Sequence, residues 1–425
     1  MIIKCHDHLC PATPQGQTST SNGPILSGEF FRPKRRGASL NRERASRRAG
    51  VHSIRYILAG LAVSAVVFAA FGELLARQLS IIDRMNGVPR ELYLATSIPD
   101  LPYTLRPGVI VERQSRNSDY TVRVNRLGFR GPETSEQPPA ETHRVLALGD
   151  SVVFGEGLAE ADSFPIQLEQ ELNRSSPVSF QVVNGAVSGY NTGAEAALLR
   201  EHGMKLSPQT VVLGVSLNDF GPAPVVTANG FLSSAQKERT TWTWFTNHSE
   251  FYVLLQWMIT YARRGHPFQK IAREATAAKQ PLGDGIWEQL DRGVAVRHQR
   301  FYRNPSGPGW EKVREGLLDI KALAAAHGAR LVLVVFPESF QVTAEPAGKA
   351  AVPDDELRPQ RAWLNLCKEL GLECVDLQPA FQAVRERPLF MDTQHPNEAG
   401  HRIAARVVAR VLLGPVGSRP PAFPS

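Results

Sequence analysis

The sequence predicts an α/β protein: a three-layer α/β/α sandwich with a parallel sheet, preceded by a transmembrane helix and a small β-rich neck. From residue 145 onward, apolar β-type runs alternate with helical patterns, as in a parallel sheet covered on both faces. An uncharged apolar run precedes this region, and a basic segment precedes that run. With 425 residues, 42% of them hydrophobic, the chain is long enough to bury such a core.

Five apolar runs are expected to form the strands of the sheet. They are RVLALG (144–149), SFQVVNG (179–185), QTVVLGVS (209–216), ARLVLVVFP (329–337) and LECVDL (372–377). Five helical patterns lie between and after them: Phe164–Leu172, Thr192–His202, Gly309–His327, Leu357–Leu370 and Asn397–Leu413.

The net charge of +7 lies entirely in the N-terminal segment. Residues 1–55 carry ten Lys and Arg against three acidic residues, and the remaining chain has 38 of each sign. A neutral folded region offers no general surface for phosphates, so we expect no nucleic-acid partner.

The run Tyr56–Gly72 holds seventeen residues without a charge, and Leu74 to Ala76 extend it beyond Glu73. A helix of roughly 20 residues crosses the hydrocarbon core, whereas the apolar part of a secretory signal has about 7–15 residues. We therefore expect a retained membrane anchor. Cleavage after Ala70-Phe71-Gly72 is the alternative, since small residues stand at both required positions.

The arginine-rich side of the anchor is expected to stay in the cytoplasm. The prediction is a bacterial inner-membrane protein with one span, a cytoplasmic N-terminus and its main α/β domain in the periplasm. The predicted segments are a basic, disordered tail (1–53), the transmembrane helix (54–76), the β-rich neck (77–140) and the main α/β domain (141–415). Val51 is an alternative start of translation.

Two regions depart from the α/β alternation. YTVRVNRLGFRGPE in the neck is typical of a short β element that ends in a Gly/Pro turn. The insertion at about 220–308 carries four of the six tryptophans, and a lid and a packing elaboration are both open for it. Within it FYVLLQWMITY (251–261) is too short for a second span and suits a half-buried helix.

The four cysteines form two pairs. Cys5 and Cys10 bracket CHDHLC, which we do not interpret as a metal site because no second ligand cluster follows. Cys367 and Cys374 flank a predicted helix end and the next strand. We expect two buried thiols there, with a local disulfide as the alternative.

Reactive side chains follow several of the predicted strands. Ser151 comes after the first strand, Gly189 after the second and Asn218 after the third, and Asp392 and His395 stand in the last loop. Because the carboxyl ends of parallel strands meet at one edge, these residues are expected to gather at one rim. They supply the hydroxyl, base, orienting acid and oxyanion donors that acyl transfer requires.

These stretches resemble the blocks of the SGNH hydrolases, also called the GDSL esterase and lipase superfamily. LALGDSVVFG is similar to the first block, AVSGYN to the second, GVSLND to the third and DTQHPNEAGH to the last. The resemblance covers about residues 144–413. It implies that Ser151 is the nucleophile, that His395 is the base with Asp392 beside it, and that Ser151, Gly189 and Asn218 form the oxyanion hole.

The sequence departs from the family pattern at two positions, and its neck shows a further resemblance. Val152 replaces the usual Leu, and Ser216 replaces a Gly two residues before Asn218, so the turn that aims Asn218 is expected to differ. VNRLGFRGPE resembles the necks of membrane-tethered bacterial members, in which we expect Arg130 to be a structural ion-pair residue.

The chemistry of a serine esterase requires neither metal nor cofactor, and none is expected. An imidazole with its ordinary pKa of about 6.5 would activate Ser151 at neutral pH, so activity is expected to rise through a pKa of about 6–7. The chain has no G-x-S-x-G elbow and no P-loop ending, which argues against an ordinary α/β-hydrolase and a phosphate site.

The sequence therefore predicts a membrane-anchored, extracytoplasmic serine esterase that acts on an acylated, for example acetylated, envelope glycan or lipid. Two alternatives stay open. One is an O-acyltransferase that uses the same site in cell-envelope polysaccharide modification, alongside a membrane-bound O-acyltransferase partner. The other is a catalytically silent binding module, which the intact set of site residues disfavours.

Overall fold

The computed structural model describes residues 37–79, 90–114, 119–227, 230, 232–233, 244–245, 248–264, 307–342, 358–384 and 388–414. By its internal contacts the chain divides into two units, Met1–Val67 and Phe68–Ser425. The second unit contains the neck and the predicted catalytic domain.

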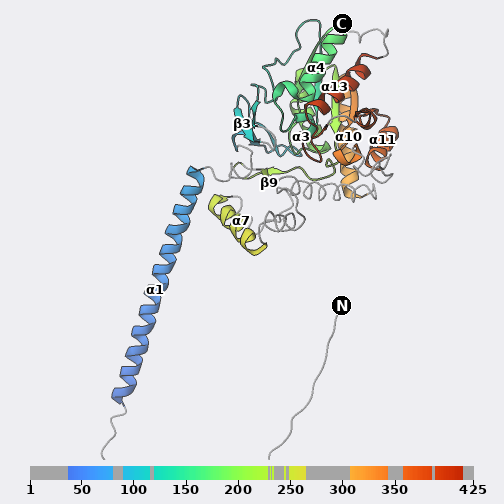
Figure 1. The fold of residues 1–425 in the computed structure, drawn as a ribbon. Helices are drawn as coiled ribbons and strands as arrows, with labels where there is room; N and C mark the ends of the chain where they lie inside the picture. Colours follow the sequence, from blue (N-terminus) through green and yellow to red (C-terminus); the bar gives the residue numbers. More distant parts are fainter. Residues whose placement is uncertain are drawn as a thin grey trace, which may run out of the picture. The chain divides into compact units, whose positions relative to one another are not determined.

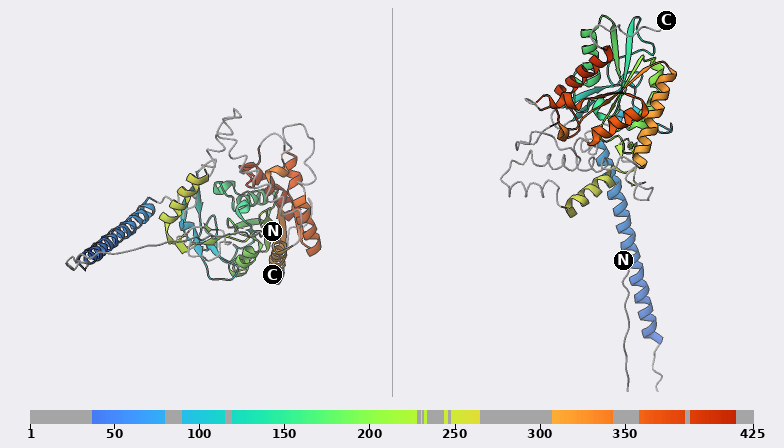
Figure 2. Two further views of the ribbon diagram at one scale, coloured as in Figure 1. Left: turned by 90° about the horizontal axis from the view of Figure 1, so that it is seen from below. Right: turned by 90° about the vertical axis from the view of Figure 1, so that its right-hand side faces the viewer.

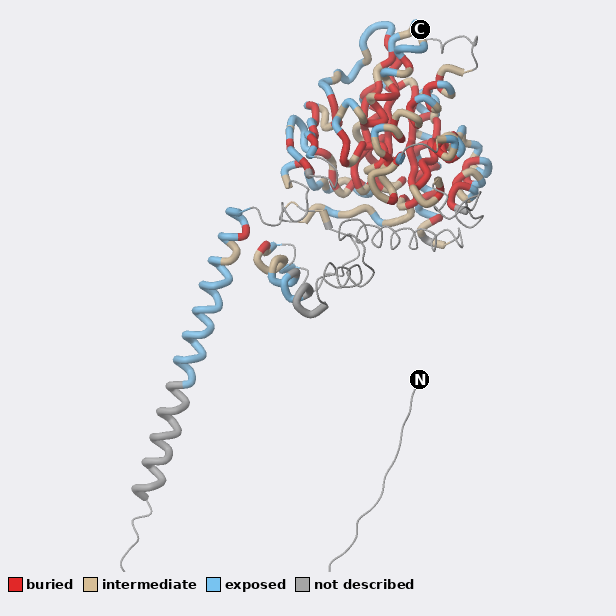
Figure 3. The backbone as a smooth tube through the Cα atoms, in the orientation of Figure 1, coloured by how far each residue is buried: buried red, intermediate tan, exposed pale blue. Residues whose placement is uncertain are grey.

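A five-stranded parallel sheet lies at the centre of the second unit (Figure 1). Its strands, in spatial order, are β11 (Glu373–Asp376), β10 (Arg330–Val335), β7 (Thr210–Val215), β5 (Thr142–Leu148) and β6 (Ser179–Asn184). Each of the five predicted runs overlaps one of these strands. Every residue of β5 and β7 is buried, which explains the continuous apolar runs at 145–148 and 211–215, and Figure 3 shows the middle of this unit largely in red.

Helices cover both faces of the sheet. They are α4 (Phe164–Ser175), α5 (Thr192–Glu201), α10 (Pro308–Ala326), α11 (Arg358–Leu370) and α13 (Glu398–Leu413). The chain moves from β5 to β6 in one direction and from β6 to β7 in the other, so right-handed crossovers place α4 and α5 on opposite faces. α13 packs on α4 and α10 packs on α5. The right-hand view of Figure 2 shows α10 in orange and α13 in red on the two sides.

Strand order reverses next to β5 and β7, because the connections that leave these neighbouring strands run to opposite faces. At such a switch point the loops diverge and leave a crevice at the carboxyl edge of the sheet. The loops that carry Ser151 and Asn218 leave β5 and β7 at this place.

The neck is β-rich, as its sequence predicts. β1 (Tyr93–Ala95) pairs with β2 (Tyr103–Leu105), and β3 (Ile110–Gln114) pairs with β4 (Asp119–Arg123), both antiparallel. A single bridge joins Arg130 to Asn184 at the end of β6. Buried neck residues such as Tyr103, Val122 and Phe129 belong to the same apolar core as the central strands, so the neck packs against the sheet.

The N-terminal helix α1 spans Gly37–Gln78. Its stretch Ile54–Gln78 is, among the described residues, the one helix long and apolar enough to cross a membrane, a test that a signal sequence also passes. All of its side chains from 54 to 71 are exposed.

The insertion is described in part. β8 (Val225–Val226) pairs with β9 (Leu232–Ser233), and α7 (Glu250–Arg264) includes the stretch expected to be a half-buried helix. Phe251 to Leu254 are half-buried, as predicted. Most of 234–306 lies outside the described residues, so the choice between a lid and a packing elaboration is untested. The CHDHLC segment also lies outside them, so the expectation that it holds no metal is untested.

Short helices complete the described chain. They are η1 (Arg90–Leu92), α3 (Ser151–Phe154), η2 (Glu160–Asp162), η3 (Gly203–Leu206), η4 (Ser339–Gln341) and α12 (Gln378–Gln382).

The expectation of two free thiols at Cys367 and Cys374 is wrong, because the structure joins them in a disulfide. Cys367 lies near the end of α11, and the turn through Gly371, which has a φ of +60°, returns the chain into β11. The turn brings the two Cα atoms to 6.3 Å, within the range that a disulfide spans.

Candidate active site

Ser151 is the first residue of α3, directly after β5. Gly149, with a φ of +153°, makes the turn, and a Cβ at this position would lie 2.5 Å from Val153 Cγ2 and 2.9 Å from Gly214 O. The buried Asp150 carboxylate caps α3 by accepting the Val152 N–H at 2.8 Å. As the first residue of a helix, Ser151 has a backbone N–H without an intrahelical acceptor.

Ser151, His395 and Asp392 form one chain of hydrogen bonds. His395 Nε2 lies 2.9 Å from Ser151 Oγ, and Nδ1 lies 2.8 Å and 3.0 Å from the two carboxylate oxygens of Asp392. The N–H groups of Gln394 and His395 both donate to Asp392 Oδ1 at 2.8 Å, which fixes the carboxylate against the ring. The structure thus brings together the three residues that the sequence assigns to nucleophile, base and orienting acid.

The pKa values in this chain differ from those expected from sequence. Burial alone lowers the pKa of His395, but the hydrogen bond and charge of Asp392, then the charges of Glu156 and Asp150, outweigh burial and raise it to about 9. Burial raises the pKa of Asp392, yet His395 and the two N–H groups bring it down to about 2. The ordinary imidazole pKa assumed above is therefore wrong for this site, because Asp392 is bonded to the ring and the charges of Glu156 and Asp150 add to its effect.

The loop that carries Gly189 is tied to the Ser151 turn. Val187 N–H donates to Gly149 O at 3.0 Å, and Gly185 N–H donates to Ala147 O at 2.8 Å. Gly189 has a φ of +85°, and a Cβ there would lie 2.9 Å from the hydroxyl of Tyr103 and 3.0 Å from Pro224 Cγ. Only glycine fits this position.

The Asn218 side chain is held by two polar groups below the site. Ser216 Oγ donates to Asp150 Oδ2 at 2.9 Å or to Asn218 Oδ1, since its one proton serves one acceptor at a time, and the serine that departs from the usual glycine therefore lies between the two loops. Burial raises the pKa of Asp150, and hydrogen bonds from Val152, Ser216 and the Asn218 amide oppose that rise. An amide carries two N–H bonds, so the bond to Asp150 does not use both donors of Asn218.

Two further carboxylic acids lie beside Asp150, and the sequence analysis did not single them out. Glu195 and Asp219 are buried, and Asp219 Oδ2 accepts the Ser216 N–H at 2.8 Å. Burial and the charge of Asp150 raise the pKa of Glu195, while burial and the charges of Glu195 and Asp150 raise the pKa of Asp219. Both shifts favour the neutral acid and limit the negative charge under the site.

A second network reaches the site from the neck. Arg113 of β3, which is 4% exposed, forms an ion pair with Glu156, and Ser188 Oγ donates to the same carboxylate at 2.6 Å. Tyr120 OH donates to it at 3.1 Å, and Tyr103 OH donates to Ser188 O at 2.7 Å. No motif predicts these contacts, because they join residues 32 to 85 positions apart in the sequence.

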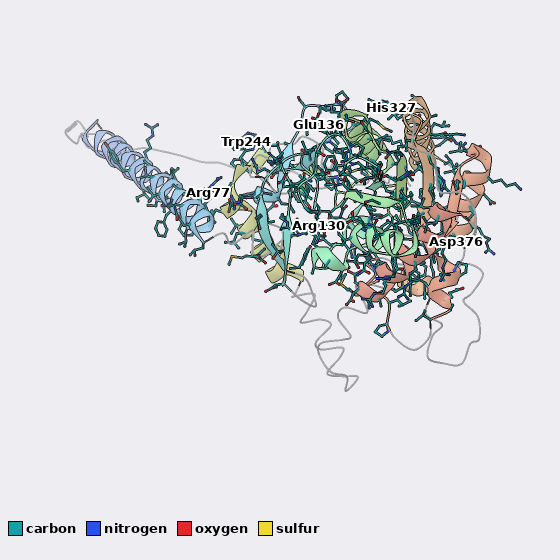
Figure 4. The ribbon with its side chains drawn as sticks, turned by 90° about the horizontal axis from the view of Figure 1, so that it is seen from above. Arg77, Arg130, Glu136, Trp244, His327 and Asp376 are labelled. Atoms are coloured by element: carbon teal, nitrogen blue, oxygen red, sulfur yellow. A yellow bond between two sulfur atoms is a disulfide. The ribbon has the colours of Figure 1, made fainter. Side chains whose placement is uncertain are left out.

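Arg130 is structural, but not as the expected ion-pair residue. Its guanidinium donates to the carbonyl oxygens of Phe154, Gly155 and Leu158 at 2.6 to 2.9 Å and stacks on the Phe154 ring. It therefore holds the loop after α3 by its backbone carbonyls. Figure 4 labels Arg130 within the domain.

In the described ranges, no group of three or more His, Cys, Asp or Glu residues is arranged to hold a metal ion.

Comparison with known proteins matches residues 147–403, more than half of the chain, to the GDSL-like lipase/acylhydrolase family. A comparison with curated proteins found no match.

Solved structures similar to this chain include an acetylxylan esterase from Geobacillus stearothermophilus, at 17% identity and a TM-score of 0.36, covering 63% of this chain and 93% of the other. Another is a lipase/acylhydrolase from Enterococcus faecalis, at 12% identity and a TM-score of 0.34, covering 64% and 95%. Neither similarity is close enough to indicate a substrate.

Proposed function

Because this chain belongs to the GDSL-like lipase/acylhydrolase family and is an ester-bond hydrolase of that family, we propose that it is a membrane-anchored, extracytoplasmic serine esterase. Its proposed substrate is an acyl ester, with acetyl as the first candidate, on an envelope glycan or lipid. The observation that carries the proposal is the continuous chain from Ser151 Oγ through His395 to Asp392.

In the proposed reaction, Ser151 Oγ attacks the ester carbonyl while His395 Nε2 takes the hydroxyl proton. The oxygen of the tetrahedral intermediate carries the negative charge and accepts hydrogen bonds from the N–H groups of Ser151 and Gly189 and from the Asn218 amide. Protonated His395 then gives its proton to the leaving alkoxide, and an acyl-enzyme remains. Water, activated by the same imidazole, releases the acid and restores Ser151.

Asp392 orients the ring throughout and stabilises its protonated form. With a pKa of about 2 it stays ionised at neutral pH, so the pair carries the transferred proton on His395. The high pKa of His395 favours proton uptake during the attack, at the cost of a smaller fraction of free base at neutral pH.

Two observations support the proposed location. The disulfide between Cys367 and Cys374 is typical of proteins in oxidising compartments. The apolar stretch Ile54–Gln78 follows the basic segment that the positive-inside rule would keep in the cytoplasm.

The activity is tested with the full chain purified in detergent. It is incubated with acyl esters of increasing chain length and with acetylated glycans, each with and without a sugar acceptor. We expect ester hydrolysis and labelling by a serine-directed phosphonate, with Ser151→Ala as the control. If acyl groups pass to the acceptor in preference to water, the protein is an O-acyltransferase and the esterase proposal fails.

The location is tested with reporters fused after residue 425. A reporter that works only outside the cytoplasm should be active, and a cytoplasmic reporter should be silent. The reverse result would contradict the proposed topology.

A further inference from the structure

Helix α7 is attached to the C-terminal end of the apolar stretch of α1 by a carboxylate. Glu73 accepts the Ser249 hydroxyl at 2.8 Å and the backbone N–H groups of Glu250 and Phe251 at 3.2 and 3.0 Å. These are the first N–H groups of α7, so Glu73 caps this helix from another part of the chain. Arg77 adds a bond to His248 O at 3.0 Å.

Apolar contacts support the same attachment. The ring of Phe251 occupies the space beside Gly72, where a Cβ would lie 2.6 Å from two ring atoms. Phe68 packs edge-on against this ring at a centroid distance of 5.5 Å. Figure 1 shows α7 next to this end of α1, and Figure 4 labels Arg77 and Trp244 there.

The apolar face that begins at Phe251 continues along α7 and is exposed. Leu255 and Met258 follow Phe251 at intervals of four and three residues and so share its face, with Ile259 beside them. They are 40%, 54% and 40% exposed, respectively. Trp244 and Phe245, just before the helix, are also exposed large side chains.

We propose that α7 lies in the membrane interface, with the face formed by Leu255, Met258 and Ile259 in contact with lipid. The position of α7 identifies lipid as the partner of this face. Phe251, on the same face, touches residues 68 and 72 of the stretch that would cross the membrane. Gly72 lies six residues, roughly 9 Å of helix, before the end of that stretch, so the exposed face starts at the depth of the interface. Exposed apolar side chains on a short helix, with an exposed tryptophan shortly before it, suit this region.

The carboxylate of Glu73 fits the same arrangement. A charge near the end of a membrane span is costly unless it has partners. The N-terminus of α7 and Arg77 supply these partners, so the same bonds hold α7 in place and stabilise the Glu73 carboxylate.

The inference rests on the membrane anchor of the proposed function, and one experiment tests the two separately. Cys5 and Cys10 are replaced by Ser, and a single cysteine is introduced at Met258, at Gln256 or at Phe71. Gln256 is exposed and, two residues from Met258, points to nearly the opposite side of α7 from it, and Phe71 lies in the apolar stretch of α1. Each full-length variant is labelled with a polarity-sensitive fluorophore and reconstituted in vesicles of phosphatidylcholine and phosphatidylglycerol, with or without brominated acyl chains.

We expect bromolipid to remove about half of the emission at Met258, since an interfacial helix inserts by roughly 5–10 Å, and little at Gln256. Glu73→Ala should abolish the difference between these two sites by releasing α7. Quenching at Phe71 with equal, weak quenching at 256 and 258 would overturn the interface proposal and leave the anchor standing. No quenching at Phe71 would overturn both.

Discussion

The rim of the parallel sheet and the neck both reach the loop that carries Ser188 and Gly189, but through different contacts. From the rim, a backbone group makes the contact, because Val187 N–H donates to Gly149 O. Ser216, whose hydroxyl lies between Asp150 and Asn218, makes a similarly short contact within the rim itself. From the neck, long side chains make them: Tyr103 bonds to Ser188 O, and Arg113 holds Glu156 against the Ser188 hydroxyl.

This difference suggests a division of work. The rim supplies the groups that would touch reacting atoms, and their positions follow from strand ends and backbone turns. The neck holds the loop that carries Ser188 and Gly189 in place and adds charged groups near it, but supplies none of the groups that would touch reacting atoms. Rim substitutions should therefore remove catalysis, whereas neck substitutions should change the rate modestly or move its pH dependence.

The largest effect is expected at the nucleophile and its base. Ser151→Ala or His395→Ala should lower kcat on the order of 10⁴–10⁶, because these residues act as a unit with Asp392. Steady-state hydrolysis of one activated ester measures the loss, and thermal unfolding checks that each variant is folded. Undiminished phosphonate labelling of a folded Ser151→Ala protein would contradict the nucleophile assignment.

The fold could be predicted because its signals are local. Each central strand is a short apolar run between turn residues, and α4, α5, α10, α11 and α13 begin and end within a few residues of the predicted limits. The disulfide could not be predicted, because the spacing of Cys367 and Cys374 does not reveal where the turn through Gly371 places them.

The predicted part of the site consists of residues that directly follow strands or stand in the last loop. Ser216 is the instructive case, since its departure from glycine is visible in the sequence but its hydroxyl bridge between Asp150 and Asn218 requires the structure. Arg113, Glu156 and Tyr103 carry no local signal. The packing of the neck on the sheet brings these residues to their partners. The effect of Glu156 on the pKa of His395 depends on the same packing and so has no signal in the sequence either.

The next largest effect is expected at Asn218, whose amide has two proposed acceptors, the Asp150 carboxylate and the oxyanion. One amide N–H bonds to Asp150 and opposes the rise of its pKa, and the second N–H is the donor that the proposed mechanism assigns to the oxyanion. Asn218→Ala should lower kcat by about 10²–10³ with little change in KM, because the interaction strengthens in the transition state. A loss below about threefold would mean that the amide is fully engaged by Ser216 and Asp150 and that the backbone donors hold the charge alone.

A smaller effect is expected from the neck at Tyr103. Tyr103→Phe removes the 2.7 Å bond to Ser188 O and keeps the ring edge-on between Tyr93 and Tyr190. One neutral hydrogen bond contributes about 0.5–1.5 kcal/mol, so kcat should fall about two- to tenfold. Tyr190→Phe is the matched control, because its hydroxyl bonds to Tyr103 O and does not contact Ser188. A hundredfold loss in Tyr103→Phe alone would end the distinction between rim and neck.

The smallest change in maximal rate, but the most specific one, is expected at Glu156. The base must be neutral to accept the Ser151 proton, so kcat/KM should rise with pH through the pKa of His395, about 9. The carboxylates of Asp392, Glu156 and Asp150 favour the protonated ring, and Arg113 offsets part of the Glu156 charge. Glu156→Gln removes one of these charges, so the rise should move to lower pH by about one unit or less, with the plateau nearly unchanged.

The control for Glu156→Gln is another pair between the neck and the loop after α3. Arg123 bonds to Glu160 at 2.8 Å, but Glu160 is not among the groups that raise the pKa of His395. Glu160→Gln should therefore leave the pH profile in place. Profiles of kcat/KM from roughly pH 6 to 10, with thermal unfolding at each end, separate a pKa change from a loss of folded protein. An unmoved profile in folded Glu156→Gln would mean that the neck acts on this site through position alone, and equal shifts in both variants would indicate a general charge effect.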